Sequence, residues 1–165
     1  ADLLVVGVAD NIMNKGVGIH MDILISHNLS AGIGVNYQNV KEFLYNDRPT
    51  DFTTTTITFD TKIYLGKDRN NGLYISPFIR SRSRVYHAEV LTKHPTDPMD
   101  HITYNSSTIS YGTAFGYKLL LNKFFIGLNI GFGAILYESS DFEDDPELYK
   151  TSNDTRAEAY IGIRL

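Results

Sequence analysis

Charged side chains recur at every second position in several stretches of this sequence. Arg80, Arg82 and Arg84 follow this spacing, as do Arg156 and Glu158. If these stretches are β-strands, side chains two residues apart point to the same face of the sheet. Such a face suits either a closed network of ion pairs or a path for ions or protons. The sequence predicts one interior ion network, formed by Asp22, Asp60, Arg80, Arg82, Arg84, Arg156 and Glu158. Within it, Arg80 and Asp60 are expected to be diagonal neighbours on adjacent strands and to pair with each other.

A second combination of residue types would suit ester hydrolysis. His87 and Glu89 share one face of their predicted strand, and Ser107 lies on the same face of the strand expected beside it. A serine, a histidine and a carboxylate close together serve as nucleophile, base and orienting group in many hydrolases. The sequence has no Gly-x-Ser-x-Gly turn of the kind that presents such serines. We therefore predict no catalytic residue and keep a lipid-modifying enzyme as the alternative function.

Metal-binding patterns are weak. The five histidines are scattered, and the chain has neither a cysteine nor a His-Glu-x-x-His motif. Two aspartates lie between His94 and His101 in one predicted loop, and Glu143, Asp144 and Asp145 lie in another. Carboxylate oxygens in the second loop would suit Ca²⁺ or Mg²⁺, but their spacing is not that of an EF-hand. The sequence predicts no metal site and no cofactor.

The composition limits the classes of protein to which the chain can belong. Its 165 residues suit a single domain, taken as residues 1–165. A net charge of −4 provides no broad basic surface, so we expect no nucleic-acid partner. No apolar run approaches the roughly 18–20 residues of a transmembrane helix. The mean hydropathy of −0.18 is low, but lipid-facing and lumen-facing residues alternate in membrane barrels and cancel in such averages.

The clearest pattern in the chain is an alternation of apolar with small or polar residues between Phe124 and Tyr137. Phe124, Ile126, Leu128 and Ile130 alternate with residues that are mostly glycine or asparagine. In a strand, this pattern produces one continuous apolar face and one nearly bare face. A bare second face suits the crowded inside of a narrow barrel whose outside contacts lipid.

The same alternation recurs along the chain and predicts an all-β protein. Its connections alternate between short turns and long polar segments, of which Asn39–Asp51 and Glu138–Asp154 are the longest. An eight-stranded antiparallel up-and-down transmembrane β-barrel has this arrangement, with its long loops all at one end. The predicted strands are about Leu3–Ala9, Gly16–Ser26, Ser30–Gln38, Thr53–Gly66, Gly72–Val90, Ile102–Leu121, Phe124–Tyr137 and Thr155–Leu165. On the last three of these strands, the residues expected to face lipid are Ile109, Phe115, Ile126, Ile130, Ile161 and Ile163.

On these features the chain resembles the small eight-stranded outer-membrane β-barrel proteins, such as the OmpA membrane domain and OmpX-like proteins. The alternating Ala159, Ile161, Ile163 and Leu165 look like the C-terminal signal of that class, with leucine in place of the usual aromatic residue. The resemblance implies a location in the outer membrane of a Gram-negative bacterium, and a first residue Ala1 would fit a cleaved signal peptide. It also implies contact with outer-membrane lipid and lipopolysaccharide.

The expected function is non-enzymatic. An eight-stranded barrel is only wide enough for side chains to fill, so we expect a plugged polar interior. Membrane integrity or surface interaction through the outer loops would then be the role, alone or as a subunit of a larger complex with a membrane-protein partner. A soluble lipocalin-like ligand-binding barrel is the remaining alternative, and it requires the opposite orientation of the two faces. The loop residues predicted to carry an interaction are Phe43, Leu44, Tyr45, Glu143, Asp144 and Asp145.

Overall fold

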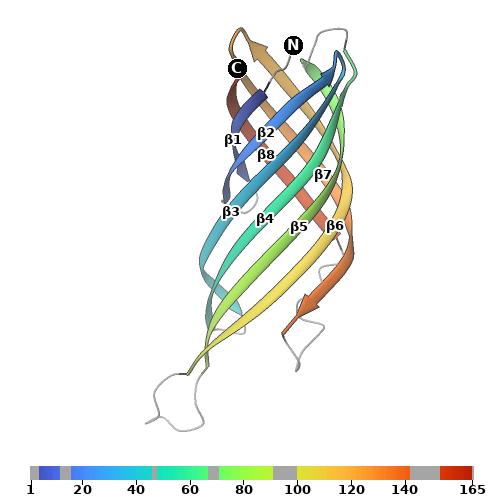
Figure 1. Ribbon diagram of the computed structural model, residues 1–165. Coiled ribbons are helices and arrows are strands. Elements are labelled where there is room, and N and C mark those ends of the chain that lie inside the picture. Colours follow the sequence, from blue (N-terminus) through green and yellow to red (C-terminus); the bar gives the residue numbers. More distant parts are fainter. Residues whose placement is uncertain are drawn as a thin grey trace.

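The computed structural model describes residues 4–11, 16–45, 48–66, 71–90, 100–141 and 153–164. Strands that are adjacent in the sequence pair antiparallel, and β1 also pairs with β8, so the sheet closes into a barrel (Figure 1). The predicted all-β, antiparallel up-and-down architecture is confirmed. The strands are β1 (Leu4–Asn11), β2 (Gly16–Ser26), β3 (Leu29–Tyr45), β4 (Arg48–Tyr64), β5 (Gly72–Val90), β6 (Asp100–Leu121), β7 (Phe124–Ser140) and β8 (Asn153–Arg164).

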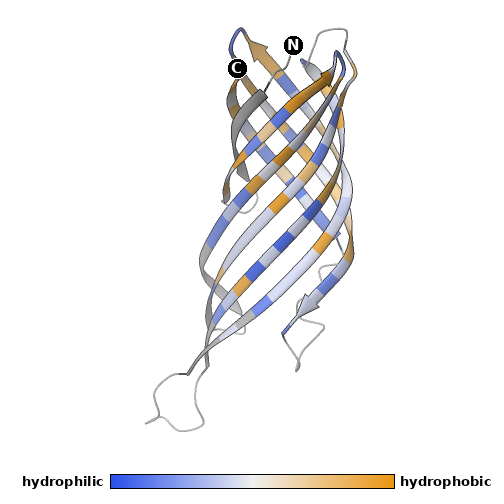
Figure 2. Ribbon diagram, in the orientation of Figure 1, coloured by the Kyte–Doolittle hydropathy of each residue, from blue (hydrophilic) through white to orange (hydrophobic). Residues whose placement is uncertain are grey.

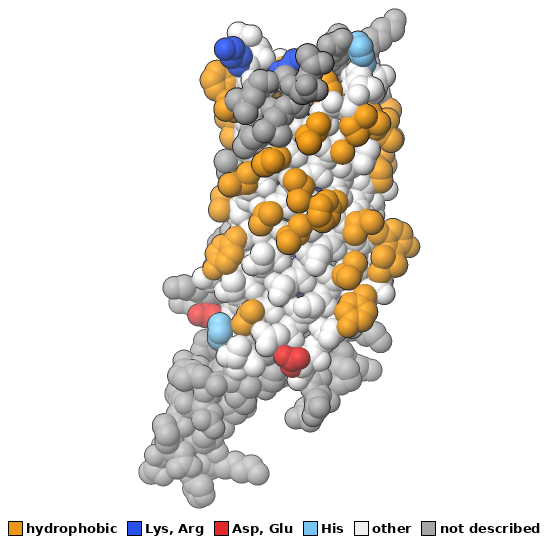
Figure 3. Space-filling view, viewed as in Figure 1, with side chains coloured by type: hydrophobic (Ala, Val, Ile, Leu, Met, Phe, Trp, Pro, Cys, Tyr) orange, Lys and Arg blue, Asp and Glu red, His pale blue; other side chains and the backbone are white. Residues whose placement is uncertain are grey.

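The two faces of the sheet differ in polarity as the alternation predicts. Large apolar side chains on the outside are 39–63% exposed, whereas Asp60 and Arg80 are buried inside. Figure 2 shows the resulting alternation along the strands that it colours, and Figure 3 shows hydrophobic side chains gathered over the middle of the barrel face in view. A lipocalin-like barrel has an apolar cavity and a charged exterior, and the two faces of this chain have the opposite polarity. The residues predicted to point outward, and found exposed, are Ile109, Phe115, Ile126, Ile130, Ile161 and Ile163.

Glycines on the inner face make room for large side chains in the narrow barrel. A Cβ atom at Gly116 would overlap the ring of Tyr74, and one at Gly127 would overlap the ring of Tyr160. The inner faces of β6 and β7 carry these small residues because tyrosines on β5 and β8 fill the space above them. The bare face seen in the sequence is thus a packing requirement of the closed barrel.

The strands at the end away from the termini are longer than predicted. The expected loop Asn39–Asp51 is largely strand, because β3 continues to Tyr45 and β4 begins at Arg48. Backbone pairing places Phe43 opposite Thr50 and Tyr45 opposite Arg48. Beyond the apolar belt both faces can meet water, so the alternation that identifies a strand fades while the backbone hydrogen bonds continue. We call this the loop end of the barrel and the opposite end, which carries both termini, the turn end (Figure 1).

No helix in the described ranges is long and apolar enough to cross a membrane.

Candidate functional site

The turn end of the lumen is filled by aromatic side chains. Tyr64 and Tyr74 lie where β4 ends and β5 begins, and their ring centroids are 5.4 Å apart. The Tyr160 hydroxyl donates a hydrogen bond to the Tyr74 hydroxyl over 3.1 Å, and the Tyr160 ring lies 6.0 Å from that of Phe125. Lys118 is 1% exposed, and its Nζ lies 4.4 Å from the centre of the Phe125 ring. This aromatic layer leaves little room for water at the turn end.

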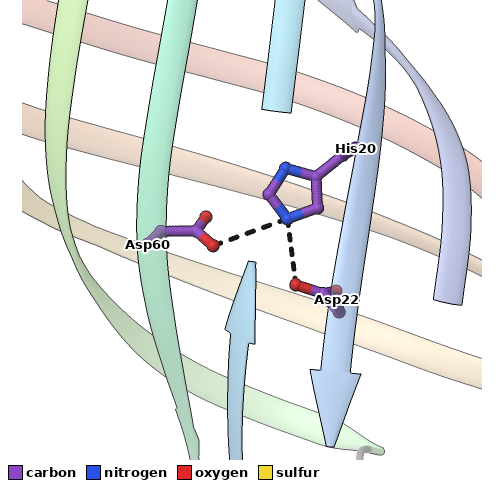
Figure 4. Close-up of side chains that lie close together, drawn as sticks. All are labelled: His20, Asp22 and Asp60. Atoms are coloured by element: carbon purple, nitrogen blue, oxygen red, sulfur yellow. Dashed lines mark hydrogen bonds and ion pairs between the residues drawn. The ribbon is translucent and has the colours of Figure 1, made fainter. Parts of the chain in front are cut away.

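Next to this layer, four polar side chains from β2 and β4 meet in a cluster. His20 Nε2 lies 2.9 Å from Asp22 Oδ1 and 3.4 Å from Asp60 Oδ1 (Figure 4). Lys62 Nζ lies 2.8 Å from His20 Nε2 and 3.6 Å from Asp60 Oδ1, and it also donates to Asp22 Oδ1. Strand β3, which lies between β2 and β4, carries Gly32 at this height, where any side chain would collide with both aspartates. The alternation in the sequence predicts that Asp22, Asp60 and Lys62 point into the barrel. It does not predict that they contact His20.

The histidine and two aspartates of this cluster also have the donor atoms of a metal site. One ligand atom from each of His20, Asp22 and Asp60 lies within 4.8 Å of the other two. The Lys62 ammonium group already lies among these atoms and is only 3% exposed. A buried cation must be paired, and two carboxylates next to each other need positive charge as much as Lys62 needs negative charge. Lys62 therefore supplies the charge that a metal ion would otherwise bring.

Arg156 on β8 links this cluster to the middle of the lumen. Its Nη2 donates to Glu158 Oε2 over 2.6 Å, and its Nη1 lies 3.5 Å from Asp60 Oδ2. Asn129 on β7 donates a second hydrogen bond to Glu158, over 3.2 Å. The guanidinium group also lies 5.7 Å from the centre of the Phe78 ring. Asp60, Arg156 and Glu158 thus form one connected chain of charges across the barrel.

Two arginines nearer the loop end share one carboxylate. Arg80 Nη1 and Arg82 Nη2 both donate to Asp154 Oδ1, over 2.9 and 2.5 Å, and Ser110 Oγ donates to Asp154 Oδ2 over 2.5 Å. We expected Arg80 to pair with Asp60, and this is wrong. Thr58 is the residue opposite Arg80, so Asp60 is its diagonal neighbour as predicted, but Asp60 instead contacts Lys62 and Arg156.

Asp154 is the acidic residue that sequence reasoning missed. It was assigned to the last long loop, whereas β8 begins at Asn153 and places Asp154 inside the barrel. Its spacing from Arg156 and Glu158 is the usable signal, because the three residues occupy alternate positions of one strand. Extending the predicted strand by two residues would have found it.

Arg84 occupies the next inward position of β5 toward the loop end. Its Nη1 donates to the Tyr86 hydroxyl over 2.8 Å, and its Nε lies 3.3 Å from Thr54 Oγ1. The guanidinium carbon also lies 5.5 Å from the centre of the Phe52 ring. Among the residues that the structure describes, Arg84 has no carboxylate partner. It therefore stands apart from the other six residues predicted for the ion network, which contact one another or share partners.

The predicted hydrolase residues do not come together. Ser107 pairs with Ser83, while His87 pairs with Thr103, which comes four residues before Ser107 in β6. At about 3.4 Å per residue, this register separates Ser107 from His87 by far more than a hydrogen bond. His87 Nδ1 instead lies 3.3 Å from Thr103 Oγ1. The side chain of Glu89 lies outside the described residues.

The predicted interaction residues are only partly covered by the structure. Phe43, Leu44 and Tyr45 belong to β3 and not to a loop, which corrects the prediction, and their side chains lie outside the described residues. Glu143, Asp144 and Asp145 also lie outside the described residues, as does Leu165. Their predicted role in surface interaction stays a prediction.

The outer wall has a groove of about 860 Å³ that crosses β4 to β7. Thr61, Pro77 and Thr113 line it, between larger side chains such as Phe59 and Phe132. Proline has no backbone N–H, and the pairing of β4 with β5 is interrupted between Asp60–Phe78 and Ile63–Ile75. The groove therefore coincides with a local weakness in the hydrogen-bonded wall.

Solved structures with a similar fold are outer-membrane proteins. A major outer-membrane protein of Thermus thermophilus matches with a TM-score of 0.70 at 10% identity, covering 100% of both chains. CarO of Acinetobacter baumannii matches with a TM-score of 0.54 at 10% identity, covering 99% of this chain and 97% of CarO. Ail, the attachment invasion locus protein of Yersinia pestis, matches with a TM-score of 0.51 at 8% identity, covering 99% of this chain and 97% of Ail.

At these identities the likeness shows the fold alone, which is that of the small outer-membrane β-barrels, as the sequence predicted. No curated protein matches the chain. A family model described as "Protein of unknown function (DUF3575)" matches residues 6–164. Since that match spans almost the whole chain, the protein belongs to the DUF3575 family.

Proposed function

We propose that this protein is a non-enzymatic integral barrel of the bacterial outer membrane with a plugged polar interior. The observation that carries the proposal is the uncharged apolar belt around the outside of a polar lumen. The exposed charged side chains of the described residues, such as Asp51, Lys123 and Asp141, lie at strand ends or in turns. An arginine or lysine facing lipid near the midplane would cost about 2–4 kcal/mol, so a lipid environment accounts for their absence from the belt.

The edges of the belt support the same assignment. Membrane barrels place aromatic side chains where lipid meets water. Tyr37 and Tyr137 are exposed toward the loop end, and Tyr117 and Phe124 are exposed toward the turn end. An apolar surface of this extent around a whole monomer would promote aggregation in water, whereas it matches the hydrocarbon of a membrane.

The filled lumen supports a structural role over a conducting one. Tyr64, Tyr74 and Phe125 are each at most 2% exposed at the turn end, and the Lys62 cluster lies next to them. An eight-stranded barrel has just enough interior for such side chains. Membrane integrity or contact with a partner at the loop end is therefore the role that we propose.

Two measurements test this proposal together. The purified protein should insert into lipid vesicles, show a folded form whose electrophoretic mobility changes on heating, and give no stable single-channel steps in planar bilayers. An Ile130→Lys variant should fold less completely into vesicles, with Phe132→Asn as the neutral polar control on the same strand. Full solubility without detergent would contradict the membrane assignment, and reproducible conductance steps would contradict the plug.

The proposed interaction at the loop end has its own test. Removing the tip of the β3–β4 hairpin (residues 43–50) and, separately, residues 142–152 between β7 and β8 keeps Asp154 and should leave folding into vesicles intact. Each change should remove any partner that copurifies from native membranes through that segment. If both shortened proteins fold and retain every partner, the loop end does not carry the interaction.

A further inference from the structure

We propose that the lumen near the loop end contains a binding site for one small inorganic anion, of which chloride is the natural example. The site lies between the inward side chains of Arg80, Arg82 and Arg84 on β5. It is separate from the His20–Lys62 cluster and from the surface interaction proposed above.

The first observation is an imbalance of charge. Arg80 and Arg82 share the single carboxylate of Asp154. In the described part of the chain, Arg84 contacts only uncharged side chains, namely Thr54, Tyr86 and the ring of Phe52. Arginine cannot lose its proton in proteins, so this excess of positive charge cannot be removed by deprotonation. Arg80 is buried and Arg82 and Arg84 are half-buried, so water solvates them incompletely and a counter-charge nearby is favoured.

The second observation is an unused hydrogen-bond donor. Arg80 is 3% exposed, and its Nε has no hydrogen-bond partner in the described structure. A buried donor without an acceptor costs about 1–3 kcal/mol, so native proteins usually supply one. An anion beside the arginines would provide both the missing acceptor and the missing negative charge.

The third observation is a small polar cavity at the same place. It is lined by all three arginines, together with Gln38, Thr54 and Glu158 among others, and has a volume of about 20 Å³. A cavity of about 10–15 Å³ by this measure is enough for one water molecule. The space therefore accepts chloride or bromide, while a tetrahedral sulfate or phosphate is too large. Glu158 lowers the positive charge around the cavity but does not cancel it, because its carboxylate also binds Arg156, a fourth arginine.

The position of the cavity gives an anion access from water. The outward residues change from apolar to polar at this height, so Arg82 and Arg84 lie beyond the apolar belt and not at its centre. An anion reaching them from the loop end does not have to cross the aromatic layer at the turn end. The outward changes are Ile57 to Thr55 on β4, Ile79 to Ser81 on β5 and Ile109 to Ser107 on β6.

The experiment compares urea unfolding of the full chain, folded in a zwitterionic detergent, in sodium chloride and in sodium gluconate at equal ionic strength. A chloride concentration ten times the dissociation constant would lower the unfolded fraction about elevenfold. We expect a saturable, chloride-specific stabilisation that bromide reproduces and sulfate does not. Arg84→Gln should remove it. Arg164→Gln, which removes an arginine near the turn end, should keep it.

Crystals of the unaltered protein soaked in bromide provide a second measurement that does not depend on a variant. We expect an anomalous peak within hydrogen-bond distance of Arg80, Arg82 or Arg84. Equal stability in chloride and gluconate, or no bromide between these arginines, would overturn the proposal. An equal response to sulfate would show general screening only and would also overturn it. None of these results would affect the proposed membrane location, which rests on the outer face of the barrel.

Discussion

The two halves of the lumen stabilise their buried polar and charged groups in different ways. In the turn half, aromatic rings pack together and Lys62 balances two aspartates. In the loop half, three arginines face one aspartate, and a small polar cavity lies between them. The difference follows the surroundings, since the turn half is enclosed by the apolar belt while the loop half extends past it toward water. Lys118 in the turn half has no hydrogen-bond partner among the described residues and lies against the Phe125 ring instead. Arg82 and Arg84 in the loop half are only half-buried, so water or a small ion can share in balancing their charge.

The largest effect is expected from Lys62→Ala in the turn half. The substitution leaves Asp22 and Asp60 buried without their shared cation, and breaking a buried pair in this way costs ~3–5 kcal/mol. Urea titration in lipid vesicles measures the change in the free energy of unfolding. Lys123→Ala is the control, because that lysine is exposed in the turn between β6 and β7. An unchanged unfolding midpoint would show that water or another group already compensates these aspartates.

The Lys62→Ala variant also tests whether Lys62 takes the place of a metal ion in balancing the charge of the two aspartates. Without Lys62, the ligand atoms of His20, Asp22 and Asp60 remain within 4.8 Å of one another. Zn²⁺ accepts histidine nitrogen and carboxylate oxygen. Zn²⁺ should therefore raise the unfolding midpoint of Lys62→Ala and leave that of the unaltered protein unchanged. Adding Asp22→Asn to the variant should abolish the response. A similar Zn²⁺ response in the unaltered protein would show that Lys62 does not replace a metal ion.

An intermediate effect is expected from Gly116→Ala, also in the turn half. The added Cβ would overlap the ring of Tyr74, which is itself held by the hydroxyl of Tyr160. Overpacking of this kind costs about 1–3 kcal/mol. Thr56→Ala, on the inner face in the loop half, is the comparison and should be milder because it removes atoms next to an existing cavity. Equal losses in the two variants would mean that both halves are packed to the same density.

The face to which a side chain points could be predicted from the sequence where contact with lipid constrains that residue. Within the belt, the alternation placed Ile126, Ile130, Asp60 and Arg80 on their correct faces, because a slip of one residue would expose charges to lipid. Beyond the belt that constraint ends, so the extensions of β3 and β4 were predicted as a loop and Asp154 was missed.

The pairing inside the lumen could not be read from the sequence at all. Long side chains reach across the barrel, so strand register does not decide which charge meets which. Arg80 pairs with a residue 74 positions away in the sequence, although Asp60 is its diagonal neighbour on the adjacent strand. His20 gave no signal as a member of the Lys62 cluster, because a single histidine at an inward position has no characteristic spacing.

The smallest effect is expected from Arg84→Gln in the loop half. Its hydrogen bonds join neutral groups, Tyr86 and Thr54, and the substitution removes an excess positive charge beside Arg82. In gluconate, the free energy of unfolding should change by less than about 1 kcal/mol, because relief of repulsion offsets the lost hydrogen bonds. Urea titrations of Arg84→Gln and Lys62→Ala in the same vesicles compare the two changes in the free energy of unfolding. A loss as large as that of Lys62→Ala would mean that the loop half is as strictly paired as the turn half. The surplus of arginine would then be balanced by an acidic group of the chain itself, and no bound anion would be needed.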